Sequence, residues 1–585
     1  MDIKIREKYM KNIKKIIKNK KILTLILSYI VFLSVCNQKI LVPYNMISVI
    51  LFGVIYFFIY KIDLNNNYKK SLIILSSIFS LILLSGGFLF KNRYSPTIDF
   101  LNELLRPMNI IYLIGNGILI YSVLSLIIPW IIEYKSTGKE KNYPKIFLIS
   151  FIVIVICYIP YLIIFFPGII TADSLTGLNM ILKIYPVSDS HTILHLLFMY
   201  IPFKIGNLLF NNINISVGLI SLTQIVIMAL TFAYVIVFLE KRKVPNKILF
   251  IIILFYGLLP VNGFYSITLW KDIIFSCSMV LLTIECFKLI EKKNNITFKN
   301  SYMFVITSLL VVFTRNNAIY MYVILSMISL LIFKKNLKVI VPMILIVFAC
   351  YVTIKGPIFN ILKIEKSSSA EYIAIPLQQI GRMAYKNVNF TSEEKKLIDK
   401  VIPLDELKKS YNPEIVDQIK FNNKYNSKEF EKNKLKYLKL WFNLCIKHPN
   451  IAIEAYLTST LGYWYPGVEY WVTTGKIDSN DLGIHTYSFV PNRIRESFKH
   501  VISNKIPLIG FFNSIAFCFW LIFISMYILI KKKGKRIIYI YTPVIGIWIT
   551  LLIATPVYAE FRYTYSALLC LPIYIGIIFS RNNKK

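Results

Sequence analysis

Four short polar segments interrupt the apolar sequence, and each carries side chains suited to acid–base chemistry or anion binding. They read Pro-Gly-Ile-Ile-Thr-Ala-Asp-Ser (167–174), Trp-Lys-Asp (270–272), Thr-Arg-Asn-Asn (314–317) and Ala-Glu-Phe-Arg-Tyr (559–563). A carboxylate at Asp173 or Asp272 suits a general base. Arg315 and Arg562 offer the planar fork that binds phosphate. Together the segments indicate a site for a phosphorylated substrate.

Each of these residues also has an ordinary structural explanation. Asp173 follows a Pro-Gly turn and could simply cap the next helix. Lys271 and Asp272 follow a tryptophan, as at many membrane interfaces. Lysine dominates the basic residues, so the retained Arg315 favours a bidentate role over a snorkelling loop arginine. Glu560 and Arg562 could pair with each other, or Arg562 could face a phosphate.

Two further patterns leave alternatives open. His191 and His195 are four residues apart and share a helix face. A metal site would need a third ligand, such as Asp189 or Asp173, and no HExxH pattern is present. Taken alone, the histidines are better explained as polar residues at an interface. The aromatic run 463–471 suits stacking on sugars, an interfacial belt or a domain core.

Composition limits the class of protein that can carry these residues. The chain has 585 residues, of which 56% are hydrophobic and 17% charged. A soluble enzyme of this length would need more polar surface, and the recurrent apolar runs have the length of membrane-spanning helices. Eight cysteines without a CxxC pair indicate neither a disulfide framework nor a zinc site.

The net charge of +37 arises from 67 Lys and Arg against 30 Asp and Glu. These basic residues lie mostly in short segments between apolar runs, as in cytoplasmic loops, which argues against nucleic-acid binding. A basic segment precedes an apolar one from Ile22 without a cleavage site, which predicts a retained anchor. We expect both termini to be cytoplasmic.

The apolar runs predict an all-α polytopic membrane protein with about fourteen spans. The expected spans are 22–41, 44–61, 71–90, 108–133, 145–166, 214–239, 247–266, 273–290, 301–314, 318–333, 337–354, 507–530, 537–555 and 564–580. Segment 191–210 is apolar too, but counting it as a span would place four basic loops outside. The positive-inside rule therefore predicts that 174–210 forms juxtamembrane helices at the outer leaflet.

This topology has a consequence for the candidate residues, because it places all of them on the outer face. We expect four regions: accessory spans and a basic N-terminus (1–144), a core with its first outer loop at 167–213 (145–354), a mostly helical extracytoplasmic domain (355–505), and C-terminal spans (506–585).

The arrangement resembles the GT-C class of integral-membrane glycosyltransferases, which take sugars from polyprenyl-phosphate carriers. It is most similar to an uncharacterised bacterial membrane family with Pro-Gly…Asp-Ser, Trp-Lys-Asp and late Glu-Phe-Arg-Tyr turns. These are Pro167 to Ser174, Trp270 to Asp272, and Glu560 to Tyr563, and the resemblance covers about residues 145–580. The chain departs from this family pattern in the first outer loop. Many relatives have two acidic residues close together there, whereas here Asp173 is followed by Ser174.

The resemblance implies a GT-C-like helix bundle that moves a sugar from a polyprenyl-phosphate donor, by displacement at C1, to a glycan, lipid or protein of the cell envelope. Asp173 would be the base and Asp272 the second acid, which would orient Lys271 or a metal. Substrate would be bound by Lys271, Arg315, Arg562, His191 and Glu560. A divalent cation, Mg²⁺ or Mn²⁺, is left open, with Asp173 and Asp272 as its ligands.

Three other functions remain open at this stage. A lipid-linked oligosaccharide flippase or other transporter would place polar groups near the bilayer midplane and show a repeat, whereas these charges lie at one face. A polymerase or ligase of envelope polysaccharide would share the outer arginines. A non-enzymatic scaffold would leave Arg315 unexplained.

Overall fold

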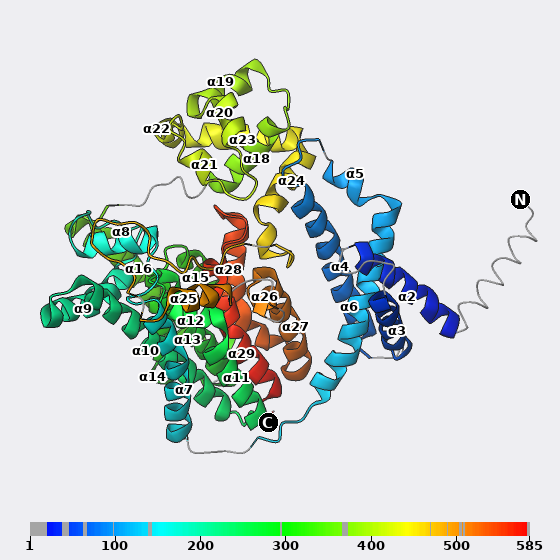
Figure 1. The fold of residues 1–585 in the computed structure, drawn as a ribbon, viewed down its shortest axis with the longest axis horizontal. Helices are drawn as coiled ribbons and strands as arrows, with labels where there is room; N and C mark the ends of the chain where they lie inside the picture. Colours follow the sequence, from blue (N-terminus) through cyan, green and yellow to red (C-terminus); the bar gives the residue numbers. More distant parts are fainter. Residues whose placement is uncertain are drawn as a thin grey trace, which may run out of the picture. The chain divides into compact units, whose positions relative to one another are not determined.

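The structure is a computed structural model (Figure 1). It describes residues 20–37, 46–62, 67–97, 99–138, 143–292, 295–365, 373–468, 470–487, 489–501, 506 and 509–581. Within these ranges the chain is helical, and β structure is limited to isolated bridges, which confirms the all-α class. Most of the predicted basic N-terminus (1–19) and residues 582–585 lie outside the described residues.

The chain divides into two compact units. Unit 1 comprises Met1–Tyr134, Gln378–Pro413 and Phe421–Gly467, and unit 2 comprises Lys135–Leu377, Glu414–Lys420 and Val468–Lys585. The segment 355–505 therefore contributes to both units. All of the candidate site residues belong to unit 2.

Unit 1 packs apolar helices against one another and carries a buried ion-pair cluster. Its helices are α2 (Lys20–Asn37), α3 (Met46–Tyr60), α4 (Lys69–Asn92), α5 (Phe100–Leu104), α6 (Pro107–Glu133), most of α18 (Ala374–Tyr385), α19 (Ser392–Val401), α20 (Leu404–Ser410), α22 (Ser427–Lys432), α23 (Lys434–Lys447), α24 (Pro449–Ser459) and η4 (Leu461–Tyr463). Arg382 and Lys386 both bind Glu454. Arg382 also donates to the carbonyls of Arg93 and Ser95, so it joins α18 to the turn after α4.

Unit 2 holds the larger helical bundle. Its helices are α7 (Tyr143–Ile164), α8 (Ala172–Ile181), α9 (Ile193–Phe210), α10 (Ile213–Glu240), α11 (Asn246–Leu258), α12 (Pro260–Ser266), α13 (Lys271–Lys292), α14 (Phe298–Thr314), α15 (Ala318–Ile332), η1 (Lys334–Asn336), α16 (Leu337–Thr353), η2 (Ile354–Ile358), α17 (Phe359–Ile361), α21 (Asp417–Lys420), α25 (Asn492–His500), α26 (Ile509–Phe512), α27 (Ile515–Lys533), η5 (Lys535–Tyr541), α28 (Thr542–Ile553), η6 (Phe561–Thr564) and α29 (Tyr565–Phe579). Polar caps begin several of them. Asn212 caps α10, Ser514 caps α27, and Thr297 forms a capping box with Asn300 at α14.

Fewer candidate spans are found among the described residues than the fourteen predicted. Ten helical stretches among the described residues are long and apolar enough to cross a membrane, or eleven if the bent pair α11–α12 counts as one span. Three predicted spans form helices of only 15 to 17 residues, namely α3, α14 and α15. The apolar run 22–41 is also absent from the ten, whereas α9 is among them. Hydropathy alone overestimated how many runs form full-length helices.

Helices α13 and α29 form the centre of unit 2. Buried residues make up 78% of the apolar window of α13 and 83% of that of η6–α29, against 22% for α7. Tyrosine hydroxyls connect the central helices, because the Tyr256 hydroxyl donates to the Leu569 carbonyl (2.8 Å) and the Tyr565 hydroxyl to Asn262 (2.8 Å). Such satisfied polar groups hold apolar helices in register.

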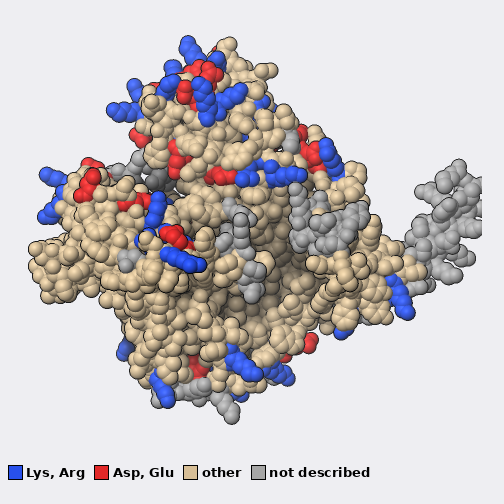
Figure 2. Space-filling model, in the orientation of Figure 1, with Lys and Arg blue, Asp and Glu red and all other residues tan. Residues whose placement is uncertain are grey.

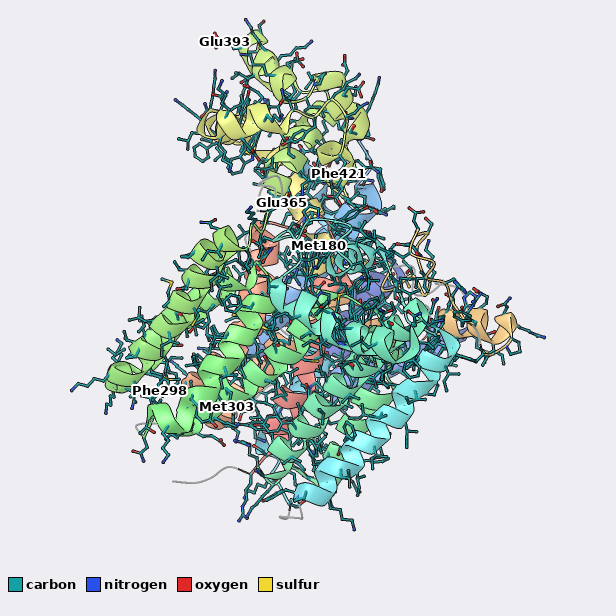
Figure 3. The ribbon with its side chains drawn as sticks, turned by 90° about the vertical axis from the view of Figure 1, so that its left-hand side faces the viewer. Met180, Phe298, Met303, Glu365, Glu393 and Phe421 are labelled. Carbon is teal, nitrogen blue, oxygen red and sulfur yellow. The ribbon has the colours of Figure 1, made fainter. Side chains whose placement is uncertain are left out.

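Unit 2 has two polar ends. At the basic end, Arg242 after α10 binds Glu291 of α13. The backbone carbonyl of Arg242 also accepts a hydrogen bond from the Arg581 amide, which follows α29 (3.0 Å). The same end carries Lys334 and Lys335 of η1 and the lysines that close α27. The opposite, mixed-charge end holds the starts of α8, α13 and η6 and the end of α14. Figure 3 shows the start of α14 at Phe298 far from Met180 of α8 and Glu365. Between its charged ends the flank of unit 2 is largely uncharged in Figure 2.

Both ends of α9 contact the mixed-charge end. At its start, the Thr192 hydroxyl donates to the carbonyl of Thr314, the last residue of α14 (3.2 Å). Toward its end, a Cβ built on Gly206 would lie 2.7 Å from the Cα of Ser216 in the first turns of α10. These turns belong to the mixed-charge end, since Ser221 donates to the Pro167 carbonyl (2.6 Å). Both ends of α9 therefore lie at the same end of unit 2, although its sequence is apolar.

Candidate active site

Backbone pairing brings the first two polar segments together. The Ile169 amide donates to the Ile267 carbonyl (2.8 Å), and the Leu269 amide donates to the Ile169 carbonyl (3.2 Å). On the other side, the Asp478 amide donates to the Ile170 carbonyl (2.8 Å). Segment 166–171 thus lies between two other segments, which places the start of α8 beside the start of α13.

Gly168 allows this close approach. Its φ of +148° is unfavourable for a side chain, and an added Cβ would lie 2.8 Å from the Ile267 carbonyl oxygen. The Pro-Gly turn at 167–168 therefore does more than end α7. It lets one backbone pack directly against the segment that leads to Lys271 and Asp272.

Asp173 is not the cap of α8, contrary to its structural explanation. The N-cap residue is Thr171, whose hydroxyl accepts from the Trp270 indole (2.7 Å). The amide of Ala172 donates to Asp478 (3.0 Å), and Ser174 donates to the Leu269 carbonyl (2.9 Å). The Asp173 carboxylate lies in the first turn and is free of the capping task.

Asp173 and Arg562 form an ion pair at the surface of the mixed-charge end, which we call the outer pair. The Asp173 side chain is 53% exposed and that of Arg562 15% exposed. The Arg562 guanidinium carbon lies 4.9 Å above the Trp270 ring centre, and Nε lies 3.5 Å from buried Glu560. The sequence left pairing or phosphate contact open for Arg562; here it pairs mainly with Asp173.

Asp272 and Arg315 form a second ion pair below the first, the inner pair. Asp272 Oδ1 accepts from Arg315 Nη1 at 2.7 Å, and the two side chains are only 2% and 8% exposed. Arg315 also donates to the Tyr563 carbonyl (3.3 Å) and lies over the Tyr563 ring. Asp272 therefore faces Arg315, and neither group faces solvent to the extent that Asp173 does.

Lys271 differs from the neighbouring cations. Its ammonium donates to the carbonyl of Ser190 at 2.7 Å, and among the described residues no carboxylate lies within ion-pair distance of it. Each of Arg315, Lys355 and Arg562, by contrast, binds a carboxylate. Lys271 is thus the cation of this end whose charge is not matched by a paired acid.

His191 is buried and supports the start of α8. Its Nε2 donates to the carbonyl of Asp173 (2.7 Å), and Nδ1 lies 3.3 Å from the Ser190 hydroxyl. Burial lowers the pKa of His191, and Lys271 lowers it further. A neutral imidazole that donates at Nε2 and accepts at Nδ1 fits both contacts. His191 therefore positions Asp173 in this structure.

The pKa values of Asp173 and Glu560 are shifted in opposite directions. Partial burial raises the pKa of the Asp173 carboxyl, but Arg562 and Lys271 outweigh it and hold that pKa below its usual value. Burial raises the pKa of Glu560 to about 7 in spite of Arg562. Asp173 is therefore charged at neutral pH, whereas Glu560 is poised to exchange a proton there.

A further ion pair lies beside the site, and the sequence did not point to it. Lys355, in the π-helical turn η2, binds Asp189 and donates to the Asn316 side chain (2.9 Å), while Asn316 donates to the Asp189 carbonyl (2.6 Å). Lys355 is one lysine among many, so its type carried no signal. The available clue was its position directly after α16, a helix that ends near the site.

A resident divalent cation does not fit the carboxylates expected to bind it. Asp173 and Asp272 each face an arginine. The described residues contain no group of three or more His, Cys, Asp or Glu side chains placed to hold a metal ion. His195 is buried within the bundle, and neither ring nitrogen has a hydrogen-bond partner.

All seven predicted site residues thus lie in unit 2, and six of them connect through direct contacts or neighbouring residues around the outer and inner pairs: Asp173, His191, Asp272, Arg315, Glu560 and Arg562. Lys271 joins them through the carbonyl of Ser190, the residue before His191. The arrangement offers an exposed carboxylate beside cationic groups, one of which lacks a paired acid.

Comparison with known proteins gives a family but no described relative. No curated protein and no solved structure matches the chain. A sequence model of one family matches residues 185–585, which is more than half of the chain. This multi-pass helical membrane protein belongs to DUF6020, a family of unknown function.

Proposed function

We propose that the protein is a membrane glycosyltransferase that moves a sugar from a polyprenyl-phosphate donor to an acceptor of the cell envelope. The observation that carries the proposal is the environment of Asp173. It is a half-exposed carboxylate held charged beside Arg562, with the unpaired Lys271 on a neighbouring helix start. A base and cations at one water-facing end are what displacement of a phosphate from a sugar requires.

In the proposed reaction, an acceptor hydroxyl attacks C1 of the sugar. The bond from the acceptor oxygen to C1 forms, and the bond from C1 to the phosphate oxygen breaks. The acceptor proton passes to Asp173, and the electron pair of the broken bond leaves with the lipid phosphate. Arg562 and Lys271 stabilise the charge that builds on that phosphate. No step is assigned to a metal ion.

The buried inner pair has a supporting part in this proposal. Arg315 binds Asp272 and the Tyr563 carbonyl, so it holds the start of α13 against η6. Those two elements carry Lys271 and Arg562. The sequence predicted Arg315 as a phosphate ligand. We propose instead that Arg315 positions the residues that bind the phosphate, and that its buried positive charge lies beneath the site.

The distribution of basic residues supports an outer location for the site. Lys and Arg side chains follow α10 and α27 at the basic end, the end expected in the cytoplasm. The candidate groups lie at the opposite end, where a polyprenyl phosphate in the outer leaflet would present its headgroup. α9, whose two ends contact this end, would lie along the outer leaflet. The acceptor is then a glycan, lipid or protein of the envelope.

The alternative of a flippase is less well supported by this geometry. The charged side chains of the site occupy one end of unit 2 and pair there with one another. A transporter needs polar groups along a path through the bundle. A polymerase or ligase that uses lipid-linked chains would share the same base and cations, so it differs in substrate size rather than in chemistry.

The test is binding and transfer with purified protein in detergent or nanodiscs. Lys271→Gln should weaken binding of polyprenyl phosphate about tenfold, because a charge-assisted contact to phosphate is lost. Lys476→Gln, at a 62% exposed lysine that faces Asp478, is the matched control and should bind as the unaltered protein does. Absence of transfer from every polyprenyl-phosphate sugar offered, together with no binding of polyprenyl phosphate, would refute the proposal.

A further inference from the structure

We infer that Trp471, with Tyr470 and Asp417, forms the subsite for the pyranose ring of the donor. This inference rests on the proposed function and names the residues that hold the sugar rather than its phosphate. The aromatic run 463–471 left sugar stacking open, and the structure divides that run between the two units. Tyr463 is buried in unit 1, whereas Tyr470 and Trp471 belong to unit 2.

Trp471 is an exposed ring on a buried support. Its side chain is 40% exposed, and its ring lies edge-on to the buried Trp270 with ring centres 6.1 Å apart. Trp270 in turn lies under the Arg562 guanidinium at 4.9 Å. One tryptophan therefore separates the Trp471 ring from the outer pair. A rigid, half-exposed aromatic face this near the reacting groups is suited to packing against a substrate.

The backbone next to Trp471 is anchored. The Tyr265 hydroxyl donates to the Val472 carbonyl at 3.0 Å, and Val472 itself is buried. The neighbouring Tyr470 packs edge-on against the buried Tyr558, with ring centres 5.6 Å apart. Both rings are therefore held by buried partners on elements that belong to the site. An exposed tryptophan that served only as a lipid anchor would not need this support.

A second carboxylate, Asp417, lies on a segment that pairs with the backbone of Tyr558, the ring partner of Tyr470. Segment 414–420 pairs with the segment before Glu560, because the Val416 amide donates to the Pro556 carbonyl (3.0 Å) and the Tyr558 amide to the Glu414 carbonyl (2.9 Å). Asp417 is 37% exposed, and its carboxylate lies 3.9 Å from the Lys420 ammonium. Burial, with a further contribution from Asp173, raises the pKa of Asp417, whose other neighbour is Lys420.

These features complement a pyranose. Its ring presents C–H groups on a flat face and hydroxyls at its rim. Trp471 and Tyr470 offer flat aromatic surfaces to the face, and the Asp417 carboxylate accepts hydrogen bonds from the rim hydroxyls. With the phosphate at Arg562 and Lys271, C1 would lie between the cations and the aromatic rings. This places C1 within reach of an acceptor activated by Asp173.

The experiment compares two ligands that differ only in the sugar. Polyprenyl phosphate and its hexose-bearing form are titrated against the full-length protein in nanodiscs. Trp471→Leu keeps apolar bulk but removes the flat face, so affinity for the hexose-bearing lipid should fall about 2- to 10-fold, with no change for polyprenyl phosphate. Trp471→Tyr should retain most of the affinity. Asp417→Asn should lower affinity for the hexose-bearing lipid alone.

The controls separate the possible failures. Trp130→Leu changes an exposed tryptophan of unit 1 (62% exposed) and should leave both affinities unchanged. Equal affinity of Trp471→Leu and unaltered protein for the hexose-bearing lipid would overturn the subsite and leave the proposed function standing. Equal loss for both lipids would assign Trp471 to the shape of the phosphate site and also overturn it. Failure of the unaltered protein to bind either lipid would refute the proposed function itself.

Discussion

The outer and inner pairs have the same chemical composition and opposite environments. Each joins an aspartate in the first turn of a helix to an arginine from a later segment. The inner pair is almost fully buried, whereas more than half of the Asp173 side chain is exposed. A buried pair cannot exchange partners without leaving a charge uncompensated, while an exposed pair exchanges at little cost. The comparison separates a permanent support from groups available to a substrate.

The largest expected effect comes from breaking the inner pair on one side. Asp272→Asn leaves the Arg315 guanidinium buried, with the Tyr563 carbonyl as its remaining hydrogen-bond acceptor among the described residues. We expect a loss of about 3–5 kcal/mol of stability. Thermal unfolding of the detergent-purified protein measures it.

The double variant Asp272→Leu with Arg315→Met tests the reason for that loss. Because both charges are removed together, most of the stability should return. Sugar transfer should not return, since the support for α13 and η6 has changed. A double variant as unstable as Asp272→Asn would show that packing, not the uncompensated charge, causes the loss.

Breaking the outer pair at Asp173 should lower the rate of transfer strongly and the stability of the fold only slightly. Asp173→Asn removes the proposed base, and transfer should fall about 10²- to 10⁴-fold. Stability should change by less than about 1 kcal/mol, because the carboxylate is exposed and the pair is screened by solvent. Transfer assays and unfolding curves on the same preparation measure both. Full activity of Asp173→Asn would remove the base from the mechanism.

The pH dependence of transfer tests whether Arg562 keeps Asp173 charged in the outer pair. Arg562 lowers the pKa of Asp173, so Asp173 stays charged to a lower pH, and the proposed transfer should persist to that pH. In Arg562→Gln, the acid limb of the pH profile should move upward by about one pH unit or more, apart from any loss in rate. Lys476→Gln should leave the limb in place. An unmoved limb in Arg562→Gln would mean that Asp173 does not set it.

The smallest effect is expected at Glu560. Its pKa of about 7 lies above the ordinary 4.5, so the folded protein holds this proton more tightly than the unfolded chain does. The resulting stability is complete below 4.5 and is lost as pH rises through 7. Melting temperatures of the unaltered protein should thus fall between about pH 5 and about pH 8, and Glu560→Gln should show a smaller fall. An identical fall in both would assign the pH dependence to other groups.

Much of the site followed from where polar residues interrupt apolar runs. Successive helices that cross a bundle return to the same end, so Asp272 at the start of α13, Arg315 after α14 and Arg562 before α29 were expected to share a face. Which acid binds which arginine was not predictable, because it depends on the depth at which each helix begins. Asp272 and Asp173 both lie in the first turn of a helix but differ in burial.

The residues that sequence analysis missed come from irregular segments. Asp417 reaches the site through backbone pairing of 414–420 with 556–558, which has no periodic pattern. Lys355 lies in a π-helical turn after α16. The span count differs for a related reason, since three of the expected spans are, among the described residues, apolar helices of only 15 to 17 residues.

The pairing of Asp173 with Arg562, 389 residues later in the chain, has a consequence for biosynthesis. During translation, Asp173 is synthesised hundreds of residues before Glu560 and Arg562. Until η6 is synthesised, Asp173 has no Arg562 to pair with, whereas Asp272 already has Arg315. The outer pair is therefore complete only after the last segment of the chain has been made, although Asp173 belongs to the first third of the sequence.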